Sequence, residues 1–292
     1  MEAATTSTTQ ARNALAGRRV AFIGCGVMAE AIISTLLRNE LVTPEQIVGA
    51  EPYAERRAEL EGRYGIRVLA SNREAVSGAD VVALTIKPQS LASVGADLRG
   101  SLRAGQVVLS ILAGATIDRL RSALGHDALV RAMPNTPAQI GYGMTVWMQT
   151  AAVDAEASAM VAAVLSAMGK AVRVDSEDAV DMATALSGTG PAYIFLVMEA
   201  LIDAGVHMGF PRRMAEELVL QTMLGSVLFA EESGKHPAEL RNMVTSPGGT
   251  SAAAIYQMEK GSLRTVISRA VWAAYQRTVE LGQGGAPAAP VK

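Results

Sequence analysis

The fold of this chain is decided by one short stretch, which reads Val20-Ala21-Phe22-Ile23-Gly24-Cys25-Gly26-Val27-Met28-Ala29. A run of apolar residues predicts a buried strand, and the pattern G-x-G-x-x-A then leads into a helix that extends to Arg38. The first glycine permits a tight turn, the second lets a pyrophosphate approach the backbone, and the small third residue lets the helix pack on the strand. The alternative is a glycine turn that merely joins the two elements. Since a second strand follows the helix, we interpret the turn as a dinucleotide site.

Up to about residue 175 the chain alternates between β-branched runs and helical patterns. Strands are predicted at residues 19–24, 46–50, 80–86, 106–112, 128–133 and 144–148, and helices at 28–38, 53–64 and 117–124. This alternation implies parallel βαβ units in a doubly wound sheet. We therefore expect a dinucleotide-binding α/β domain of the Rossmann type over residues 18–175.

From residue 178 onward the sequence predicts helices only, separated by glycine and proline. The predicted helices are 179–186, 191–208, 212–232, 237–244, 251–260 and 263–281. We expect an all-helical domain for dimerisation and substrate binding over residues 176–281. Residues 1–17 and 282–292 are predicted to be disordered tails, with a weak organelle-targeting peptide as the alternative for the first.

Composition narrows the classes of function. The 292 residues include 26 Lys and Arg against 28 Asp and Glu, so no basic excess exists to neutralise a phosphate backbone and no nucleic-acid partner is expected. Cys25 is the only cysteine and there are three histidines, which excludes an intramolecular disulfide and disfavours zinc. No metal is expected, and a reducing, cytoplasmic compartment is predicted.

The most apolar predicted helix runs from Tyr193 to Met208. A membrane span needs about 18 apolar residues without charge, whereas Glu199, Asp203 and His207 interrupt this one. A buried helix or an oligomer interface explains its composition better, so no membrane partner is expected.

The candidate cofactor residues lie in the glycine turn and at the carboxyl ends of the strands, where ligands bind in open α/β sheets. Pro88 turns the chain over the cofactor, while Ala113-Gly114 leave room for it. Lys87 is assigned to the nicotinamide side, with a surface strand end as the alternative. The full set is Ile23, Gly24, Cys25, Gly26, Val27, Met28, Glu51, Asn72, Thr85, Ile86, Lys87, Pro88, Leu112 and Ala113. Cys25 is expected only to fill space, because a nucleophile would need a nearby base.

Residues after the second strand bear on the choice between NADPH and NADH. Glu51 stands where an acid accepts a hydrogen bond from a ribose 2′-hydroxyl, which favours NADH. Arg56 and Arg57 could instead meet a 2′-phosphate, and the pair Asn72-Arg73 could reach the same ribose. Alternatively, Glu51 caps the next helix and the arginines form a solvated face. NADPH is the expected cofactor and NADH the alternative.

Two segments of the helical half are unusual for plain packing. One is Leu186-Ser187-Gly188-Thr189-Gly190-Pro191-Ala192-Tyr193, and the other is Val244-Thr245-Ser246-Pro247-Gly248-Gly249-Thr250-Ser251. The second opens a helix whose first N–H groups are flanked by hydroxyls, which suits a carboxylate ligand. The alternative is a capped interhelical turn with Ser246, Thr250 or Ser251 as the N-cap.

In order and spacing, these motifs resemble those of the pyrroline-5-carboxylate reductase family over about residues 18–281. The matching stretches are Phe22-Ile23-Gly24-Cys25-Gly26-Val27-Met28-Ala29, Ile86-Lys87-Pro88-Gln89, Arg131-Ala132-Met133-Pro134-Asn135-Thr136-Pro137, Ser187-Gly188-Thr189-Gly190-Pro191-Ala192-Tyr193 and Thr245-Ser246-Pro247-Gly248-Gly249-Thr250. The resemblance implies hydride transfer from NAD(P)H to the C=N carbon of L-1-pyrroline-5-carboxylate, giving L-proline in the last step of proline biosynthesis.

The same resemblance implies partners and a substrate site. It implies a small-molecule substrate and a homodimer interleaved through the helical domain, with larger rings such as a decamer of five dimers. The implied substrate-binding residues are Ser246, Gly248, Gly249, Thr250 and Ser251. Ser251 is the catalytic candidate, expected to bond the substrate ring nitrogen, and it stands where the family usually has threonine. Serine keeps the hydroxyl and loses the β-branch that restricts the rotamer.

Three rival functions share parts of this pattern. A β-hydroxyacid dehydrogenase would carry a lysine and an asparagine in the helix after the glycine-rich break, and the stretch Ala192–Met198 contains neither. A ketol-acid reductoisomerase would need an acidic magnesium cluster, which these helices lack. A nucleotide sensor would keep the fold and lose the catalytic activity. The glycine turn, Lys87 and the Ser246–Ser251 segment are all intact, which argues against such a loss.

Overall fold

The computed structural model describes residues 8–283. These residues form two compact units, a sheet unit that comprises the chain up to Thr189 together with the part from Ala274, and a helical unit of Gly190–Ala273. The division differs from the expected boundary at residues 175 and 176. Two sets of contacts explain the difference, because they hold the first and the last residues of the helical half to the sheet unit. We call these contacts the two tethers.

The first tether is a buried ion-pair cluster. Arg131 is 2% exposed, and its guanidinium binds the carboxylates of Glu177, at 2.9 Å, and Asp181. Glu177 Oε1 also accepts the N–H of Ile117 at 2.8 Å. A buried guanidinium needs such partners, so the helix at 177–183 is anchored to the sheet.

The second tether lies near the end of the last helix. A Cβ on Gly114, whose φ is +69°, would lie 2.8 Å from Cβ of Leu281. Arg119 Nη1 donates to the Leu281 carbonyl at 2.9 Å. The last turns of that helix therefore pack on the sheet unit.

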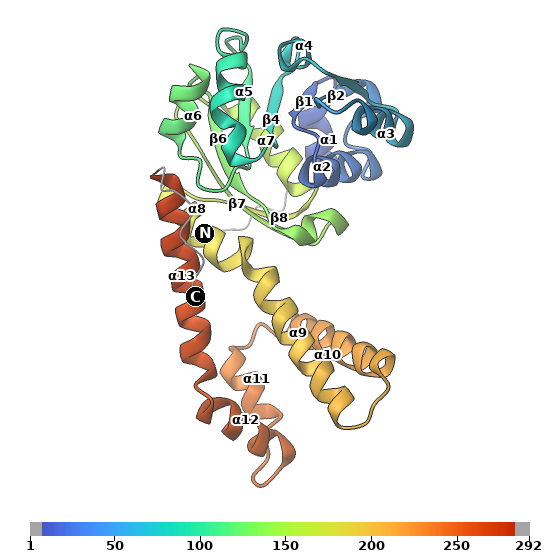
Figure 1. Cartoon of the computed structure of the whole chain (residues 1–292), viewed down its shortest axis with the longest axis vertical. Helices are drawn as coiled ribbons and strands as arrows, with labels where there is room; N and C mark the ends of the chain where they lie inside the picture. The colour runs from blue at the N-terminus through green and yellow to red at the C-terminus, as the bar shows by residue number, and fades with distance from the viewer. Residues whose placement is uncertain (1–7, 284–292) are drawn as a thin grey trace. The chain divides into compact units, whose positions relative to one another are not determined.

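The sheet of eight strands has the order β3-β2-β1-β4-β5-β6-β7-β8 (Figure 1). The strands are β1 Val20–Ile23, β2 Ile47–Ala50, β3 Arg67–Leu69, β4 Val81–Leu84, β5 Val107–Ser110, β6 Leu129–Met133, β7 Gly143–Gln149 and β8 Gly169–Arg173. The Rossmann-type doubly wound prediction is confirmed, with one exception to parallel pairing. β6 and β7 are antiparallel, because the connection at 134–142 is shorter than the dozen or so residues that a parallel crossover needs.

Helices cover both faces of the sheet. They are α1 Thr8–Leu15, α2 Val27–Arg38, α3 Ala54–Tyr64, α4 Asn72–Val76, α5 Leu91–Leu98, α6 Ile117–Leu124, α7 Ala155–Ser166 and α8 Glu177–Ala183, with short 3-10 turns η1 Pro44–Gln46, η2 Pro88–Ser90 and η3 Thr136–Ile140. One apolar cluster includes buried residues of α1, α2 and α7, and the other includes those of α4, α5 and α6. The glycine turn between β1 and α2 is therefore held by a strand and a helix that are both buried.

The prediction of a disordered tail at residues 1–17 is wrong for residues 8–15, which form α1. Ala11 and Leu15 of this helix are buried in the core. Gln46 Nε2 donates to the carbonyls of Leu15, at 2.9 Å, and Arg18, at 2.7 Å. Burial of two apolar side chains thus orders a segment that its Ser/Thr-rich composition did not favour. Residues 1–7 and 284–292 of the two predicted tails lie outside the described residues.

The helical half agrees closely with prediction, since residues 177–283 contain helices and no strand. After α8 come a π-helical turn η4 Thr184–Gly188, then α9 Gly190–His207, α10 Arg212–Ser233, α11 Pro237–Met243, α12 Thr250–Lys260 and α13 Leu263–Gly282. α9 and α10 meet closely at Gly205, where a Cβ would lie 3.0 Å from Cβ of Ala215.

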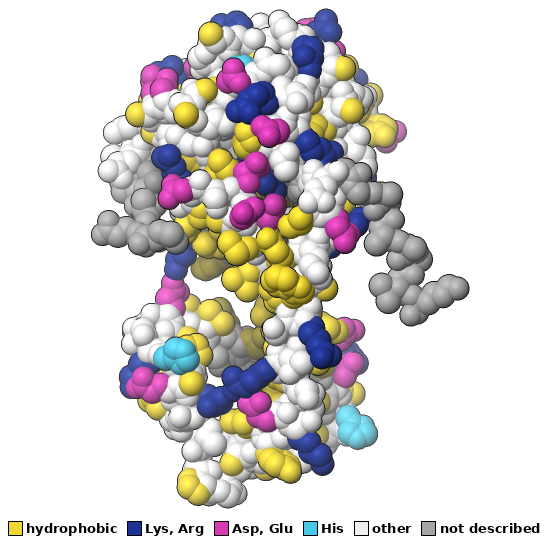
Figure 2. Space-filling view, turned by 90° about the vertical axis from the view of Figure 1, so that its left-hand side faces the viewer, with side chains coloured by type: hydrophobic (Ala, Val, Ile, Leu, Met, Phe, Trp, Pro, Cys, Tyr) yellow, Lys and Arg dark blue, Asp and Glu magenta, His cyan; other side chains and the backbone are white. Residues whose placement is uncertain are grey.

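Large apolar side chains remain exposed on the helical unit, among them Phe195, Leu196, Leu224, Phe229 and Trp272. Hydrophobic side chains are visible on its surface in Figure 2. Among the described residues, one continuous helical stretch, Glu177–His207, is long and apolar enough to cross a membrane by length and composition. One such helix is weak support for a membrane protein, because interface helices have the same composition.

Candidate active site

The glycine turn has the geometry that a dinucleotide site requires. Gly24 has φ +85°, its N–H donates to the Ala50 carbonyl at 2.9 Å, and a Cβ there would lie 2.7 Å from Cγ2 of Ile86. A Cβ on Gly26 would meet nothing within 4 Å, so the space above this residue is open. Ala29 is fully buried. The tight turn, the open approach and the close helix packing are therefore all present.

The start of α2 is suited to bind phosphate. Gly26 is the N-cap of this helix and no side chain caps it. The first N–H groups of a helix need acceptors from outside the helix, and the helix dipole favours an anion there. Val27, in the first turn, is 64% exposed, so the end of the helix is accessible from solvent.

Cys25 packs inside this turn. Its side chain is buried, with Sγ 3.6 Å from the Ala50 carbonyl oxygen, and a Cβ on Gly49 would lie 2.7 Å from Sγ. Burial, together with the charge of Glu51, raises the pKa of the Cys25 thiol to about 12. The neutral thiol is a space-filling group, in agreement with its predicted role.

Glu51 links the end of β2 to the glycine turn. Its Oε2 accepts the N–H of Cys25 at 3.1 Å, and its Oε1 accepts the N–H of Tyr53 at 3.2 Å. Since Tyr53 is the N-cap residue of α3, the carboxylate lies between the turn and the start of that helix. The position suits the predicted ribose contact and also accounts for the alternative of a cap.

The other candidates for the adenosine end hold protein partners. Arg56 Nε donates to the Cys25 carbonyl at 3.0 Å, and its Nη2 binds Glu30 at 2.5 Å. Asn72 Nδ2 donates to Asp97 Oδ2 at 3.1 Å. Arg73 also binds Asp97, at 3.0 Å. The structure thus brings Glu51 and Arg56 to the glycine turn and ties Asn72 and Arg73 to α5.

The end of β4 lies beside the glycine turn through hydrogen bonds from Thr85. Thr85 N–H donates to the Ile23 carbonyl at 2.9 Å and its hydroxyl donates to the Gly24 carbonyl at 2.5 Å. Lys87 is exposed and precedes the 3-10 turn that begins at Pro88. Leu112 is a core side chain, so only its main chain can face a ligand. The space expected at Ala113-Gly114 is used at Gly114 by Leu281.

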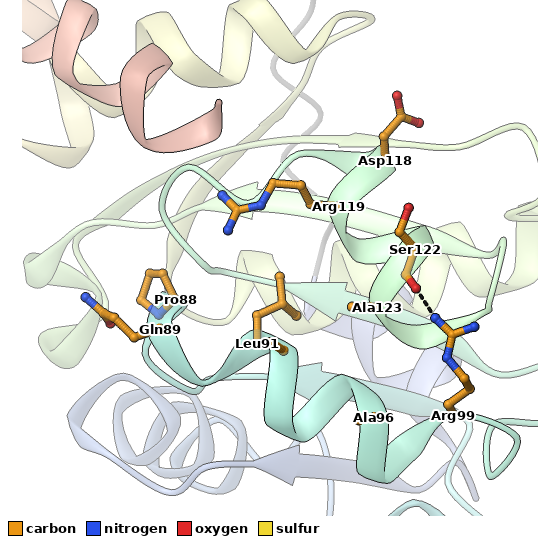
Figure 3. A pocket seen from close by; sticks show the side chains of 10 residues that line it. Pro88, Gln89, Leu91, Ala96, Arg99, Asp118, Arg119, Ser122 and Ala123 are labelled. Atoms are coloured by element: carbon orange, nitrogen blue, oxygen red, sulfur yellow. Dashed lines mark hydrogen bonds between the residues drawn. The ribbon is translucent and has the colours of Figure 1, made fainter. Parts of the chain in front are cut away.

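A cavity of about 630 Å³ lies next to these strand ends, between α5 and α6. Pro88 and Gln89 line it together with Arg119, which extends over it from α6 (Figure 3). The glycine turn does not line it. Arg99 binds the Ser122 carbonyl across the cavity, so this hollow is a gap between two packed helices rather than the dinucleotide site.

The second candidate site is the turn before α12. Gly248 has φ +71°, and the Gly249 N–H donates to the Ser246 carbonyl at 3.1 Å. A Cβ on Gly249 would lie 2.5 Å from Oγ of Ser246. Gly249 is the N-cap and no side chain caps α12, so the alternative of a Ser or Thr cap is wrong. Thr250 and the half-buried Ser251 occupy the first two positions of α12. All five predicted substrate residues therefore lie within one turn.

Two site-supporting groups were not predicted. Glu30, in the first turn of α2, binds Arg56, Arg63 at 2.7 Å and the Tyr64 hydroxyl at 2.7 Å. Asn135 Nδ2 donates to the Ser187 carbonyl at 3.1 Å. The Glu30 group had a sequence signal, because Glu30 is the one acid of a mostly apolar helix. Within residues 8–283 no group of three or more metal-ligating side chains occurs.

Comparisons with known proteins agree on one family. A family profile described as pyrroline-5-carboxylate reductase dimerisation matches residues 177–281, and one described as NADP oxidoreductase, coenzyme F420-dependent, matches residues 19–114. A pyrroline-5-carboxylate reductase of Synechocystis is 43% identical over 91% of this chain and 98% of its own length. One from Arabidopsis thaliana is 38% identical, over 91% and 96%.

Solved structures agree as well. A pyrroline-5-carboxylate reductase from Coxiella burnetii has a TM-score of 0.84 at 36% identity, over 90% of this chain and 98% of that chain. The Plasmodium falciparum pyrroline carboxylate reductase, solved with NADP bound, has a TM-score of 0.84 at 29% identity, over 91% and 98%.

Proposed function

Because the chain belongs to the pyrroline-5-carboxylate reductase family, we propose which of its residues carry the reduction of L-1-pyrroline-5-carboxylate to L-proline. The chain is an NADPH-dependent oxidoreductase acting on an imine, in proline biosynthesis. The assignment of roles to residues rests on the geometry of the two turns.

The glycine turn holds the dinucleotide. The pyrophosphate lies on the uncapped start of α2, above Gly26, where the N–H groups and the helix dipole favour it. Ile23, Thr85 and Ile86 surround the turn, and Glu51 faces the adenosine ribose. Lys87, Pro88, Leu112 and Ala113 stand at the strand ends toward the nicotinamide. When bound, the reduced nicotinamide supplies a hydride.

The turn before α12 holds the substrate. The uncapped α12 start binds the carboxylate through main-chain N–H groups around Gly248 and Thr250, with the Ser246 hydroxyl beside them. Gly249 shapes this turn, because its own N–H donates to the Ser246 carbonyl. The Ser251 hydroxyl accepts the N–H of the protonated imine and orients the ring. This uncapped start, next to three hydroxyls, is the observation that carries the assignment.

The chemistry then needs no side-chain acid. The imine enters already protonated, the hydride adds to the carbon of its C=N bond, and the nitrogen keeps its proton in the product amine. The residues of this chain bind the imine and the cofactor and orient them toward each other. Most of the rate enhancement therefore comes from positioning.

The test is a direct assay. Purified protein is mixed with pyrroline-5-carboxylate, NADPH oxidation is followed by absorbance, and proline is measured in parallel. Proline formed in step with cofactor oxidation is the expected result. No oxidation by a folded protein that binds nucleotide would overturn the assignment in favour of a nucleotide sensor.

The assembly proposed is a homodimer through the helical unit, with five dimers forming a decamer. The dimerisation profile over 177–281 and the exposed apolar residues of α9 and α10 support the homodimer. A cytoplasmic location is proposed too, supported by a buried free thiol at Cys25. Light scattering after size exclusion gives the copy number, and a monomeric mass would contradict the proposal.

A further inference from the structure

The loop that follows β5 lies against the end of α13. Leu112 and Ala115, on either side of the contact in the sequence, are buried in the core of the sheet unit. Gly114 has φ +69°, and a Cβ on it would lie 2.8 Å from Cβ of Leu281 and 3.2 Å from the main-chain nitrogen of Gly282. A side chain at position 114 would have neither the room nor a favourable backbone conformation, so the loop meets the helix end with its main chain.

Arg119 binds both sides of this contact. Its Nη1 donates to the carbonyl of Gly114 at 3.2 Å and to the carbonyl of Leu281 at 2.9 Å. The last carbonyls of an α-helix lack partners within the helix, and the helix dipole favours a cation beside them. α13 has no basic side chain in its own last turn. The guanidinium of Arg119 supplies this charge from α6 and joins the helix end to the loop.

The start of α6 gives Arg119 a fixed base. Thr116 caps this helix, since its Oγ1 accepts the N–H of Arg119 at 3.3 Å. The N–H of Ile117 donates to Glu177 Oε1 at 2.8 Å, and the Ile117 side chain is buried. From this base the Arg119 side chain extends over the cavity that Pro88 also lines (Figure 3). Arg119 thus binds one segment assigned above to the nicotinamide side and lines a cavity with another.

These contacts concern the nicotinamide end of the cofactor rather than its adenosine end. The adenosine end is assigned to the glycine turn and to Glu51, whose carboxylate is held by the N–H groups of Cys25 and Tyr53. A loop that is fixed before the cofactor arrives has less freedom to lose on binding, which favours binding of the ring. Loosening the loop after β5 therefore weakens the nicotinamide end alone.

We propose that Arg119 is a positioning residue that sets the place of the nicotinamide ring by bonding the loop after β5 to the end of α13. The inference rests on the function proposed above. Leu112 and Ala113 present their main chain to the ring. The contact of Gly114 with Leu281 fixes this part of the loop, and Arg119 holds the contact together.

The test measures the dissociation constants of two ligands for the full-length protein. One is NADPH and the other is adenosine 2′,5′-bisphosphate, which lacks the nicotinamide. Arg119→Met keeps an unbranched apolar side chain and removes the donors, so the Kd of NADPH rises by about tenfold, the effect of one charge-assisted hydrogen bond. The Kd of the bisphosphate stays within about twofold. Arg119→Lys keeps a cationic donor and recovers most of the NADPH affinity.

Arg121→Met is the matched control, because it makes the same exchange on α6 at a side chain that binds only the exposed Asp118 and Asp127. It leaves both dissociation constants within about twofold. An unchanged Kd of NADPH in Arg119→Met would overturn the proposal. Equal weakening of both ligands would do so too, because Arg119 would then only stabilise the unit.

A second variant covers the case in which Arg119→Met does not fold. Gly114→Ala places a Cβ against Leu281 and displaces the same loop, so the same two titrations decide. Weaker NADPH with unchanged bisphosphate supports the proposal, and any other result contradicts it. Neither titration needs the imine. The expected split in a protein that reduces no imine would therefore support this role of Arg119 and overturn only the proposed reaction.

Discussion

The side-chain amide of Asn135 donates a hydrogen bond of 3.1 Å to the main-chain carbonyl of Ser187. In an α-helix that carbonyl would accept from the residue four positions later, which is Pro191 and has no N–H. The turn instead winds as a π-helix, in which Thr189 N–H donates to the Thr184 carbonyl at 2.8 Å. Asn135 thus supplies the donor that the proline cannot.

Asn135→Ala is expected to destabilise the protein by about 1–3 kcal/mol, because it leaves the Ser187 carbonyl without its side-chain donor. It also removes the acceptor for Met144 N–H, at 2.9 Å. Urea unfolding at fixed protein concentration measures the change. Gln139→Ala, on the exposed face of η3, is the control and changes stability by less than about 0.5 kcal/mol. Equal stability of both variants would remove this role for Asn135.

Arg56→Ala is expected to weaken NADPH and NADH alike by about tenfold, because loss of one charge-assisted bond to the Cys25 carbonyl frees the turn at a cost near 1.5 kcal/mol. Isothermal titration with each cofactor checks this. Glu59→Gln removes an exposed partner of Arg56 and has little effect. A selective loss of NADPH would instead make Arg56 a phosphate ligand.

Ser251→Ala is expected to lower kcat by roughly 10- to 100-fold through loss of ring orientation. The cofactor dissociation constant stays nearly unchanged, because Ser251 lies on α12, outside the glycine turn. Ser251→Thr restores the hydroxyl and serves as the control. Steady-state kinetics and cofactor titration together decide, and equal losses of turnover and of cofactor affinity in the alanine variant would contradict the role.

Glu30 is expected to make stability depend on acid pH. Burial raises the pKa of its carboxyl, but hydrogen bonds from Arg56 and Tyr64 and the charges of Arg56 and Arg63 outweigh burial and hold it below the ordinary value. A folded pKa below the unfolded one gives stability that is present above the unfolded value, about 4.3, and is lost as pH falls through the folded value.

The measurement is the free energy of unfolding of the native protein and of Glu30→Gln, between pH 6 and pH 3. The difference between the two is expected to be constant above about pH 5 and to shrink below about pH 4.3. A difference that does not change with pH would show that the Glu30 cluster acts through shape alone.

Much of this architecture could be predicted from the sequence, because the residues that determine it act locally. Gly24 permits the tight turn and Gly26 leaves the approach to the backbone open. Both roles depend on neighbouring residues, so a short motif predicts them. The same holds for the turn at Gly248 and Gly249. The helices of the second half have strong periodicity and glycine or proline boundaries, and each was predicted to within a few residues.

What was missed depends on contacts between distant residues. β3 has only three residues, and it is recognisable only because Val68 and Leu69 continue the edge of the sheet. None of the five residues of β8 is buried, so its sequence lacks the apolar run of a core strand. α1 is ordered by the core that receives Leu15. The partners of Arg56 and Asn72 were not predicted, because a side chain's hydrogen bonds are set by which helices the topology brings together.

The division of the chain has a consequence for its synthesis. The sheet unit is discontinuous in sequence, because the helical unit of Gly190–Ala273 is inserted before the last turns of α13 return to Gly114. During synthesis all eight strands leave the ribosome before the last turns of α13, which belong to the same unit. The apolar faces of α9 and α10 therefore leave the ribosome while the sheet unit still lacks its final element, and a nascent chain arrested near residue 273 should be the species that chaperones hold longest.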